Sequence, residues 1–256
     1  MKIIARIKTD FGSKFGVPRQ SGMVPQLRGR VVFEKEYRVA EAVRGLEGFD
    51  YVWLLWDFSE AHREGWSPTV RPPRLGGNER VGVFATRSPF RPNNIGLSAV
   101  RLLGIDYDAK DGPVLLVGGA DLMDGTPIYD IKPYLPYTDA HPEARAGFTR
   151  GNANAEGERL EVEIPKALVR KLGEEKAAAP RGVLEADPRP RYQADVDRVY
   201  GFTFAGEEIQ FRVEGKLLKV LNDLKDSNVV IYNVAGQRLN KTQKGVNIVN
   251  GKKVLK

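Results

Sequence analysis

The chain has 256 residues, 41% of them hydrophobic, so it can fill one large core or one core plus a smaller unit. It has no cysteine and only two histidines, which excludes a disulfide framework, a thiolate zinc site and a histidine-rich metal centre. The net charge is +7, but residues 223–256 hold seven basic and two acidic residues, which leaves 33 basic and 31 acidic residues, or +2, in residues 1–222. The charge of the whole chain is therefore weak support for a nucleic-acid partner, and any basic surface on the body must come from local clustering.

The N-terminal residues carry charges and no sustained apolar core, unlike a secretory signal. No run approaches the roughly 18 apolar residues that a membrane-spanning helix needs. We therefore expect a cytoplasmic protein without a membrane segment.

The first sixty residues predict strands joined by polar loops. Residues 3–7 and 31–33 have the pattern of strands, and a proline-stiffened loop, 17–22, lies between them. Residues 38–48 place four apolar side chains on one side of a short helix. The most hydrophobic and aromatic run, residues 49–58, predicts a central strand buried on both faces.

His62 and Arg63 follow the end of that strand. Nothing beside His62 in the sequence orients its ring as an acid or base, and a lone histidine is more often solvated or structural. A long basic loop, residues 69–80, comes next.

Residues 86–94 form a polar loop that we expect to be held between two core strands, the first of them at 81–85. Two prolines stiffen this loop, so Arg87 and Arg91 project from a frame with little freedom. Guanidinium groups suit carboxylates and phosphates, which predicts a site for an anionic or zwitterionic ligand. A surface turn with solvated arginines is the alternative.

Further strands are predicted at 97–105 and 114–117, joined by an Asp-Gly turn at 107–112. Another tight turn, 124–127, lies in a stretch rich in aspartate, proline and tyrosine. Many strands with only short helices indicate a mainly β (α+β) fold built on an antiparallel, barrel-like or curved sheet. No dinucleotide fingerprint and no P-loop is present.

The second half predicts a linker at 144–158, a helix at 165–186 that is interrupted near Pro180, and an arginine loop at 187–192. Strands are predicted at 199–204, 208–213 and 217–221. We therefore divide the chain into a β-barrel domain (1–140), a small α+β domain (141–222) and a basic β-type tail (223–256).

Several long motifs together resemble one family, the TrmO (YaeB-type) tRNA methyltransferases. They are VPRQSG, RGLEGFDYVWLL, WSPTVRPPRLGG, GVFATRSPFRPNNIGLS, DLMDGTPIYDIKPYLPY and DPRPRY, and the resemblance covers roughly residues 1–222. It implies a homodimeric, single-sheet β-barrel enzyme that uses S-adenosyl-L-methionine. The implied reaction is methylation of the N6 atom of N6-threonylcarbamoyladenosine beside the anticodon of tRNA.

The resemblance also implies site residues. The S-adenosyl-L-methionine site would include Pro18, Arg19, Gln20, His62, Arg63, Arg87, Arg91, Leu97, Asp124, Gly125, Thr126 and Pro127. Asp124 could take the ammonium group or the ribose hydroxyls of this cofactor. No metal is implied.

The DPRPRY loop would face the substrate, at a cleft between subunits. Asp187 or Tyr192 is the candidate base or orienting partner for the N6 proton, and Arg189 is placed with them in the catalytic set. Candidates for the anticodon-loop phosphates or the threonyl carboxylate are Arg28, Arg30, Arg71, Arg74, Arg189 and Arg191, and Tyr134 or Tyr137 could stack on a base.

The tail resembles the C-terminal β-modules of many secreted bacterial proteins, which conflicts with a cytoplasmic enzyme. It either adds basic surface for tRNA, the interpretation we favour, or extends a sheet without a catalytic role. Two other functions stay open for the whole chain: a non-catalytic RNA-binding barrel, and a methyltransferase that acts on a small molecule. The Asp-Gly-Thr-Pro turn argues against the first, because carboxylates repel phosphates. The arginine-rich loops argue against the second.

Overall fold

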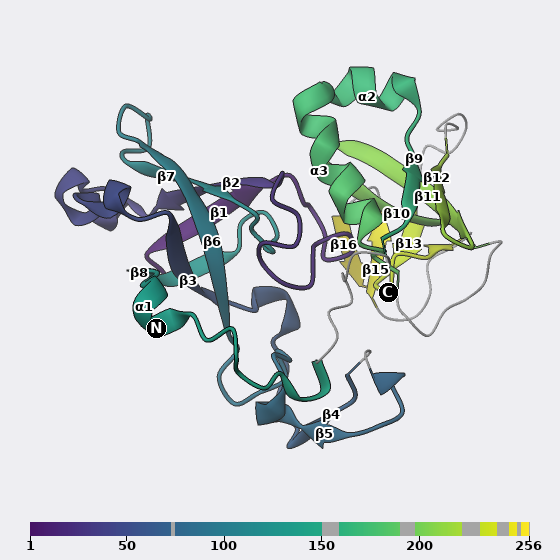
Figure 1. Cartoon of the computed structure of the whole chain (residues 1–256), viewed down its shortest axis with the longest axis horizontal. Coiled ribbons are helices and arrows are strands. Elements are labelled where there is room, and N and C mark those ends of the chain that lie inside the picture. Colours follow the sequence, from purple (N-terminus) through teal and green to yellow (C-terminus); the bar gives the residue numbers. More distant parts are fainter. Residues whose placement is uncertain are drawn as a thin grey trace.

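The computed structural model describes residues 1–72, 75–149, 159–189, 198–221, 231–239, 246–249 and 252–255. A barrel lies on one side of the molecule and two C-terminal sheets lie on the other (Figure 1). Among the described residues, no helix has the length and apolar content to cross a bilayer.

Six strands of the described chain close an antiparallel barrel in the order β1-β2-β7-β6-β3-β8, and β8 pairs back onto β1. The predicted mainly β fold with an antiparallel barrel is confirmed. The barrel strands are β1 (Ala5–Thr9), β2 (Arg28–Phe33), β3 (Tyr51–Asp57), β6 (Ile95–Asp106), β7 (Val114–Gly118) and β8 (Pro127–Pro133).

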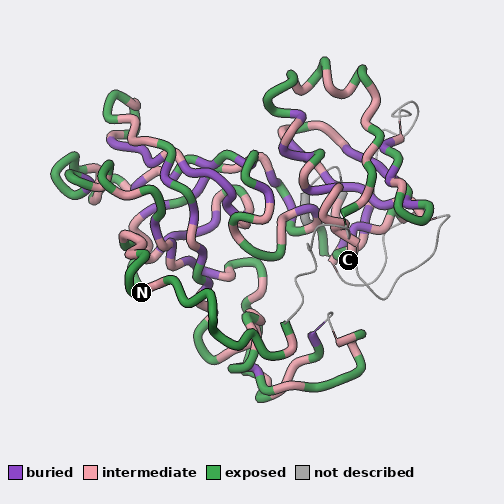
Figure 2. The backbone as a smooth tube through the Cα atoms, viewed as in Figure 1, coloured by how far each residue is buried: buried purple, intermediate pink, exposed green. Residues whose placement is uncertain are grey.

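Alternating side chains fill the barrel, as period-2 strands require. Buried residues recur along the barrel strands in Figure 2, and Ile7, Leu54 and Val117 are wholly inaccessible. In β3 the alternate residues face outward and Tyr51 is 43% exposed, so the prediction of a strand buried on both faces is wrong. On this outer face Trp53 donates to Asp139 of the short helix α1 (Pro136–Asp139), and Tyr134 packs near Tyr51 and Trp53, while Tyr51 stays partly in solvent.

Two other predicted elements differ from the structure. Residues 81–85 form the short strand β5 (Val81–Gly82), which pairs with β4 (Thr69–Val70) outside the barrel, and then one turn of 3-10 helix. Phe84 is 70% exposed, so this apolar run has no second buried face. Residues 38–48 form single 3-10 turns at Ala40–Val43 and Leu46–Gly48, after another at Lys35–Tyr37, because too few apolar side chains there are buried to hold a longer helix.

The C-terminal domain is a sheet covered by two helices. The sheet order is β10-β11-β12-β9, formed by β9 (Glu161–Glu163), β10 (Tyr200–Phe204), β11 (Glu207–Glu214) and β12 (Leu217–Val220). The helices α2 (Lys166–Leu172) and α3 (Glu174–Glu185) meet at Gly173, so the predicted interruption near Pro180 is wrong. Pro180 lies inside α3 and is buried with Ala179 and Val183, and this burial offsets the missing backbone donor.

Residues 10–27 of the N-terminal domain join the two domains. Phe11, Val24 and Leu27 are buried in the core of the C-terminal domain rather than in the barrel. Phe11 also forms an isolated β-bridge with Phe204 of β10. The loop at residues 14–20 therefore starts from a segment that both domains hold in place.

The tail forms a third sheet, β14-β13-β15-β16, from β13 (Ile231–Asn233), β14 (Arg238–Leu239), β15 (Val246–Val249) and β16 (Lys252–Leu255). It lies against the C-terminal domain, where the Gly201 N–H donates to the Gly236 carbonyl at 3.0 Å. The buried Tyr232 hydroxyl donates to the Glu208 carboxylate on β11. The described tail is thus a separate sheet that docks on the C-terminal domain through an isolated bridge and hydrogen bonds, and both interpretations of its role stay predictions.

Candidate active site

A pocket of about 470 Å³ opens at one end of the barrel. The loops at 14–20 and 86–91, the end of β3 and the start of β6 form its walls. Trp56 and Leu97 give it apolar surface, while Arg87 and Asp121 give it opposite charges. A pocket with this lining suits a ligand that carries both an aromatic part and a zwitterionic part.

A wider cleft of about 1760 Å³ lies beside the pocket and shares the residue 17–20 loop and Arg87 with it. The other side of the cleft comes from the C-terminal domain, including Asp187 and Arg189. Its basic lining residues are Lys14, Arg19, Arg63, Arg71, Arg80, Arg87, Arg189 and Lys216. The barrel pocket therefore opens onto a basic cleft between the two domains.

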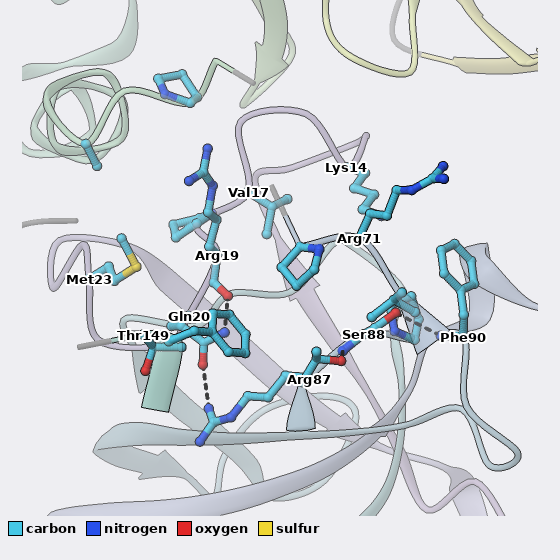
Figure 3. A pocket seen from close by; sticks show the side chains of 18 of the residues that line it. Lys14, Val17, Arg19, Gln20, Met23, Arg71, Arg87, Ser88, Phe90 and Thr149 are labelled. Carbon is cyan, nitrogen blue, oxygen red and sulfur yellow. Dashed lines mark hydrogen bonds between the residues drawn. The ribbon is translucent and has the colours of Figure 1, made fainter. Parts of the chain in front are cut away.

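The shared wall contains part of the predicted cofactor set. Pro18, Arg19 and Gln20 line both cavities, and the Arg87 guanidinium donates to the Gln20 side-chain oxygen (Figure 3). Arg91 lines the pocket but donates to the Thr86 carbonyl at 3.0 Å. Arg87 thus faces the cavities, whereas Arg91 also holds the shape of its own loop.

The predicted turn at 124–127 only partly reaches the pocket. Thr126 lines it, but Asp124, Gly125 and Pro127 lie outside the described lining of both cavities. The Asp124 carboxylate accepts the Thr9 N–H at 3.0 Å and lies 3.8 Å from Lys8 Nζ. Its contacts join the turn to β1.

His62 has a partner that its sequence neighbourhood does not reveal. Its Nε2 atom lies 2.8 Å from the Asp57 carboxylate, so the expectation that nothing orients its ring is wrong. Asp57 is 8% exposed and lines the pocket, and burial together with the Asp57 hydrogen bond raises the pKa of Tyr129. Arg63 lines the cleft, with its guanidinium 3.8 Å from the centre of the Phe90 ring.

The predicted catalytic loop is held by an internal ion pair. Arg189 donates two hydrogen bonds of 2.8 Å to the two oxygens of Asp187, which raises the pKa of the Arg189 guanidinium. The Arg189 carbonyl accepts a bond of 3.0 Å from Arg19. The bond from Arg19 joins the 187–189 segment to the loop at residues 17–20. Tyr192 lies outside the described residues.

The other predicted substrate contacts are dispersed. Arg71 lines the cleft, whereas Arg28 donates to nearby carbonyls and Arg30 pairs with an acidic residue on β6. Tyr134 packs on Trp53, and Tyr137 is 86% exposed. Arg74 and Arg191 fall outside the described residues.

Sequence reasoning missed Asp121 and Asp57. Asp121 comes three residues after β7, between Ala120 and Leu122, which are 3% and 1% exposed. A polar residue between two buried ones at the end of a strand is the signal that could have identified it. In the described chain, no group of three or more histidine or acidic side chains could hold a metal ion.

The closed barrel, with a charged pocket at one end and a basic cleft beside it, defines a ligand-binding barrel protein rather than a parallel-sheet nucleotide-binding protein. Two family models match this chain. The tRNA-methyltransferase O N-terminal domain matches residues 6–140, and the TrmO C-terminal domain matches residues 157–225. The chain therefore belongs to the TrmO family. Strands β13–β16 lie beyond both matches.

Individual relatives agree with this assignment. The Escherichia coli (strain K12) tRNA (adenine(37)-N6)-methyltransferase is 42% identical over 215 residues, which cover 82% of this chain and 91% of the relative. The Eikenella corrodens protein of the same name is 44% identical over 171 residues, covering 65% and 92%. A crystal structure of TrmO from Pseudomonas aeruginosa has a TM-score of 0.67 at 34% identity and covers 86% of this chain and 93% of that one.

Proposed function

We propose that this chain transfers a methyl group from S-adenosyl-L-methionine to N6 of adenosine 37 in tRNA, and that the substrate form of this nucleoside is N6-threonylcarbamoyladenosine. The observation that carries the proposal is a barrel pocket with paired opposite charges that opens onto a basic cleft. The activity named for the Escherichia coli relative supports the same reaction.

The pocket lining fits the proposed cofactor. Arg87 and Gln20 offer donors for a carboxylate, Asp121 offers an acceptor for a cation, and Trp56 and Leu97 offer apolar surface for a base. We keep residues 18–20 and 62–63, Arg87, Arg91, Leu97 and residues 124–127 as the proposed cofactor set. When bound, the cofactor supplies a methyl group already activated by its sulfonium, so the protein mainly has to align the acceptor nitrogen with it.

The basic cleft is the proposed tRNA site. Arg63, Arg71 and Arg80 are placed to neutralise phosphates, and this charge would make binding depend on salt. A small-molecule substrate would not need a cleft of this size and charge. Asp187, Arg189 and Tyr192 stay the proposed catalytic set, and the ion pair between the first two favours an orienting role over proton acceptance for Asp187.

The proposal also covers the domain division, the oligomeric state and the location of the protein. The barrel, the β10-β11-β12-β9 sheet and the β14-β13-β15-β16 sheet are separate, which supports the division into domains 1–140 and 141–222 and a tail, 223–256. We also propose a homodimer and a cytoplasmic location, and both rest on the family resemblance. Sedimentation of the full chain would measure its oligomeric state.

The first test is calorimetric titration with S-adenosylhomocysteine, followed by methyl transfer to tRNA that carries N6-threonylcarbamoyladenosine. We expect one site per chain, and Arg87→Ala should weaken it about 10–100-fold, because a hydrogen bond to a charged group is lost. Arg44→Ala is the matched control, since Arg44 is exposed, pairs with Glu41 at 3.6 Å and lines neither cavity. No binding by the folded wild-type chain contradicts the cofactor assignment and favours the RNA-binding barrel.

Replacing Arg189 with alanine should separate substrate alignment from cofactor binding. The change removes the guanidinium pair with Asp187 but not the carbonyl that accepts from Arg19. We expect kcat/KM for tRNA to fall about 10–100-fold through misplacement of the loop, with S-adenosylhomocysteine affinity unchanged within twofold. Arg212→Ala, an exposed change on β11, is the control. Equal losses of activity and affinity contradict the placement of Arg189 at the substrate.

A further inference from the structure

Asp121 is a partly buried carboxylate at the wall of the barrel pocket. It follows β7, and its neighbours Ala120 and Leu122 are packed in the barrel core. The same pocket wall includes Trp56 from β3 and Leu97 from β6. The backbone at residue 121 is thus anchored in the core while the residue lines the pocket.

A chain of hydrogen bonds fixes this carboxylate. Trp56 Nε1 donates to Ser98 Oγ at 3.0 Å, and Ser98 Oγ donates to Asp121 Oδ1 at 2.6 Å. Ser98 is 1% exposed, so this chain is shielded from water. Burial raises the pKa of the Asp121 carboxyl group, and the backbone amide of Ser21, next to residues 18–20, is among the groups that lower it and favour the charged form. The carboxylate is therefore held before any ligand arrives.

The electrostatic setting favours a cationic partner. Burial raises the pKa of Asp121, and the nearby positive charge of Arg87 opposes this effect. The Arg87 guanidinium also donates to Gln20, so its positive charge only partly compensates the negative charge of Asp121. A partly desolvated carboxylate gains most from a cation that reaches it inside the pocket.

A carboxylate and a guanidinium that line one small pocket complement an α-amino acid head, whose ammonium and carboxylate share one carbon. We propose that Asp121 binds the α-ammonium group of the cofactor while Arg87 faces its α-carboxylate. This inference rests on the proposed function and adds a residue to it. It also differs from the sequence-based assignment of the ammonium to Asp124, whose carboxylate is engaged by Thr9 and Lys8.

The test compares ligands with and without the amino-acid head. The full chain is titrated with S-adenosylhomocysteine and with 5′-methylthioadenosine, which keeps the adenosine and the sulfur but lacks the head. We expect Asp121→Asn to lower the affinity for S-adenosylhomocysteine about 10–100-fold, as for a lost hydrogen bond to a charged group. The affinity for 5′-methylthioadenosine should stay unchanged within twofold. Asp108→Asn, in the exposed turn after β6, is the matched control.

A second arm uses the wild-type chain alone, so it holds even if Asp121→Asn does not fold. The analogue of S-adenosylhomocysteine with hydrogen in place of the ammonium group should bind the wild type about 10–100-fold more weakly, and Asp121→Asn should not weaken it further. Equal binding of this analogue and S-adenosylhomocysteine by the wild type overturns the proposal. The proposal is also overturned if Asp121→Asn loses affinity for S-adenosylhomocysteine and for 5′-methylthioadenosine equally. It is overturned as well if only Asp124→Asn loses affinity for S-adenosylhomocysteine while keeping its affinity for 5′-methylthioadenosine. Failure of the proposed function is recognised separately, because the wild type would then bind neither ligand.

Discussion

The Gly96→Ala variant is expected to lose about 1–3 kcal/mol of unfolding free energy, as overpacked cores do. Gly96 lies at the start of β6, and a Cβ atom there would lie 2.2–2.5 Å from the indole carbons of Trp56. Trp56 cannot yield easily, because it is 9% exposed and its ring centre lies 4.2 Å from that of Phe58. Moving the indole would also break its bond to Ser98.

The same change should weaken S-adenosylhomocysteine binding, since Gly96, Trp56 and Asp121 line one pocket. Urea denaturation measures the stability and calorimetry measures the affinity. Gly82→Ala is the matched control, because nothing lies within 4 Å of a Cβ atom at that strand position. Equal unfolding free energies for the two variants would contradict the close packing of Trp56 on β6.

Local patterns predicted a barrel-like or curved sheet and five of the six barrel strands of the described chain, because alternation, apolar runs and turn residues depend on neighbours within a few positions. The strand β8 was not predicted, since its sequence is rich in turn-forming and charged residues. Whether the outer face of β3 is covered could not be predicted, because it depends on which distant segments pack there. The 81–85 run shows the same limit, since its apolar residues form a strand only where a partner lies alongside.

The candidate site was likewise predicted only in part. The stiff arginine loop at 86–94 predicted a ligand site and the family resemblance added residues 18–20, and the structure brings both segments to one pocket. The bond from Ser98 to Asp121 joins residues 23 positions apart, on different elements. Asp121 and Asp124 stand in one acidic stretch, and the packing of the strands shows which carboxylate lines the pocket and which belongs to the turn.

Gly236→Ala is expected to release the tail from the body of the protein. Gly236 has φ +74, and a Cβ atom there would lie 2.2–2.3 Å from ring carbons of Phe15. The left-handed backbone costs about 1–2 kcal/mol for a residue with a side chain, and the clash adds to this cost. Hydrogen exchange at the Gly201 amide, which donates to the Gly236 carbonyl, reports the release directly.

Gly206→Ala separates the two costs, because Gly206 has φ +82 but nothing within 4 Å of its added Cβ atom. The exchange at the Gly201 amide in Gly236→Ala, beyond that in Gly206→Ala, therefore measures the clash with Phe15. The Phe15 ring stacks on Tyr200 with ring centres 6.3 Å apart. Phe15 directly precedes residues 16–20, which line the cleft, so a displaced Phe15 should also weaken S-adenosylhomocysteine binding. Loss of tail protection without loss of affinity would show that the tail has no role in cofactor binding. Equal exchange at Gly201 in both variants would contradict the docking contact itself.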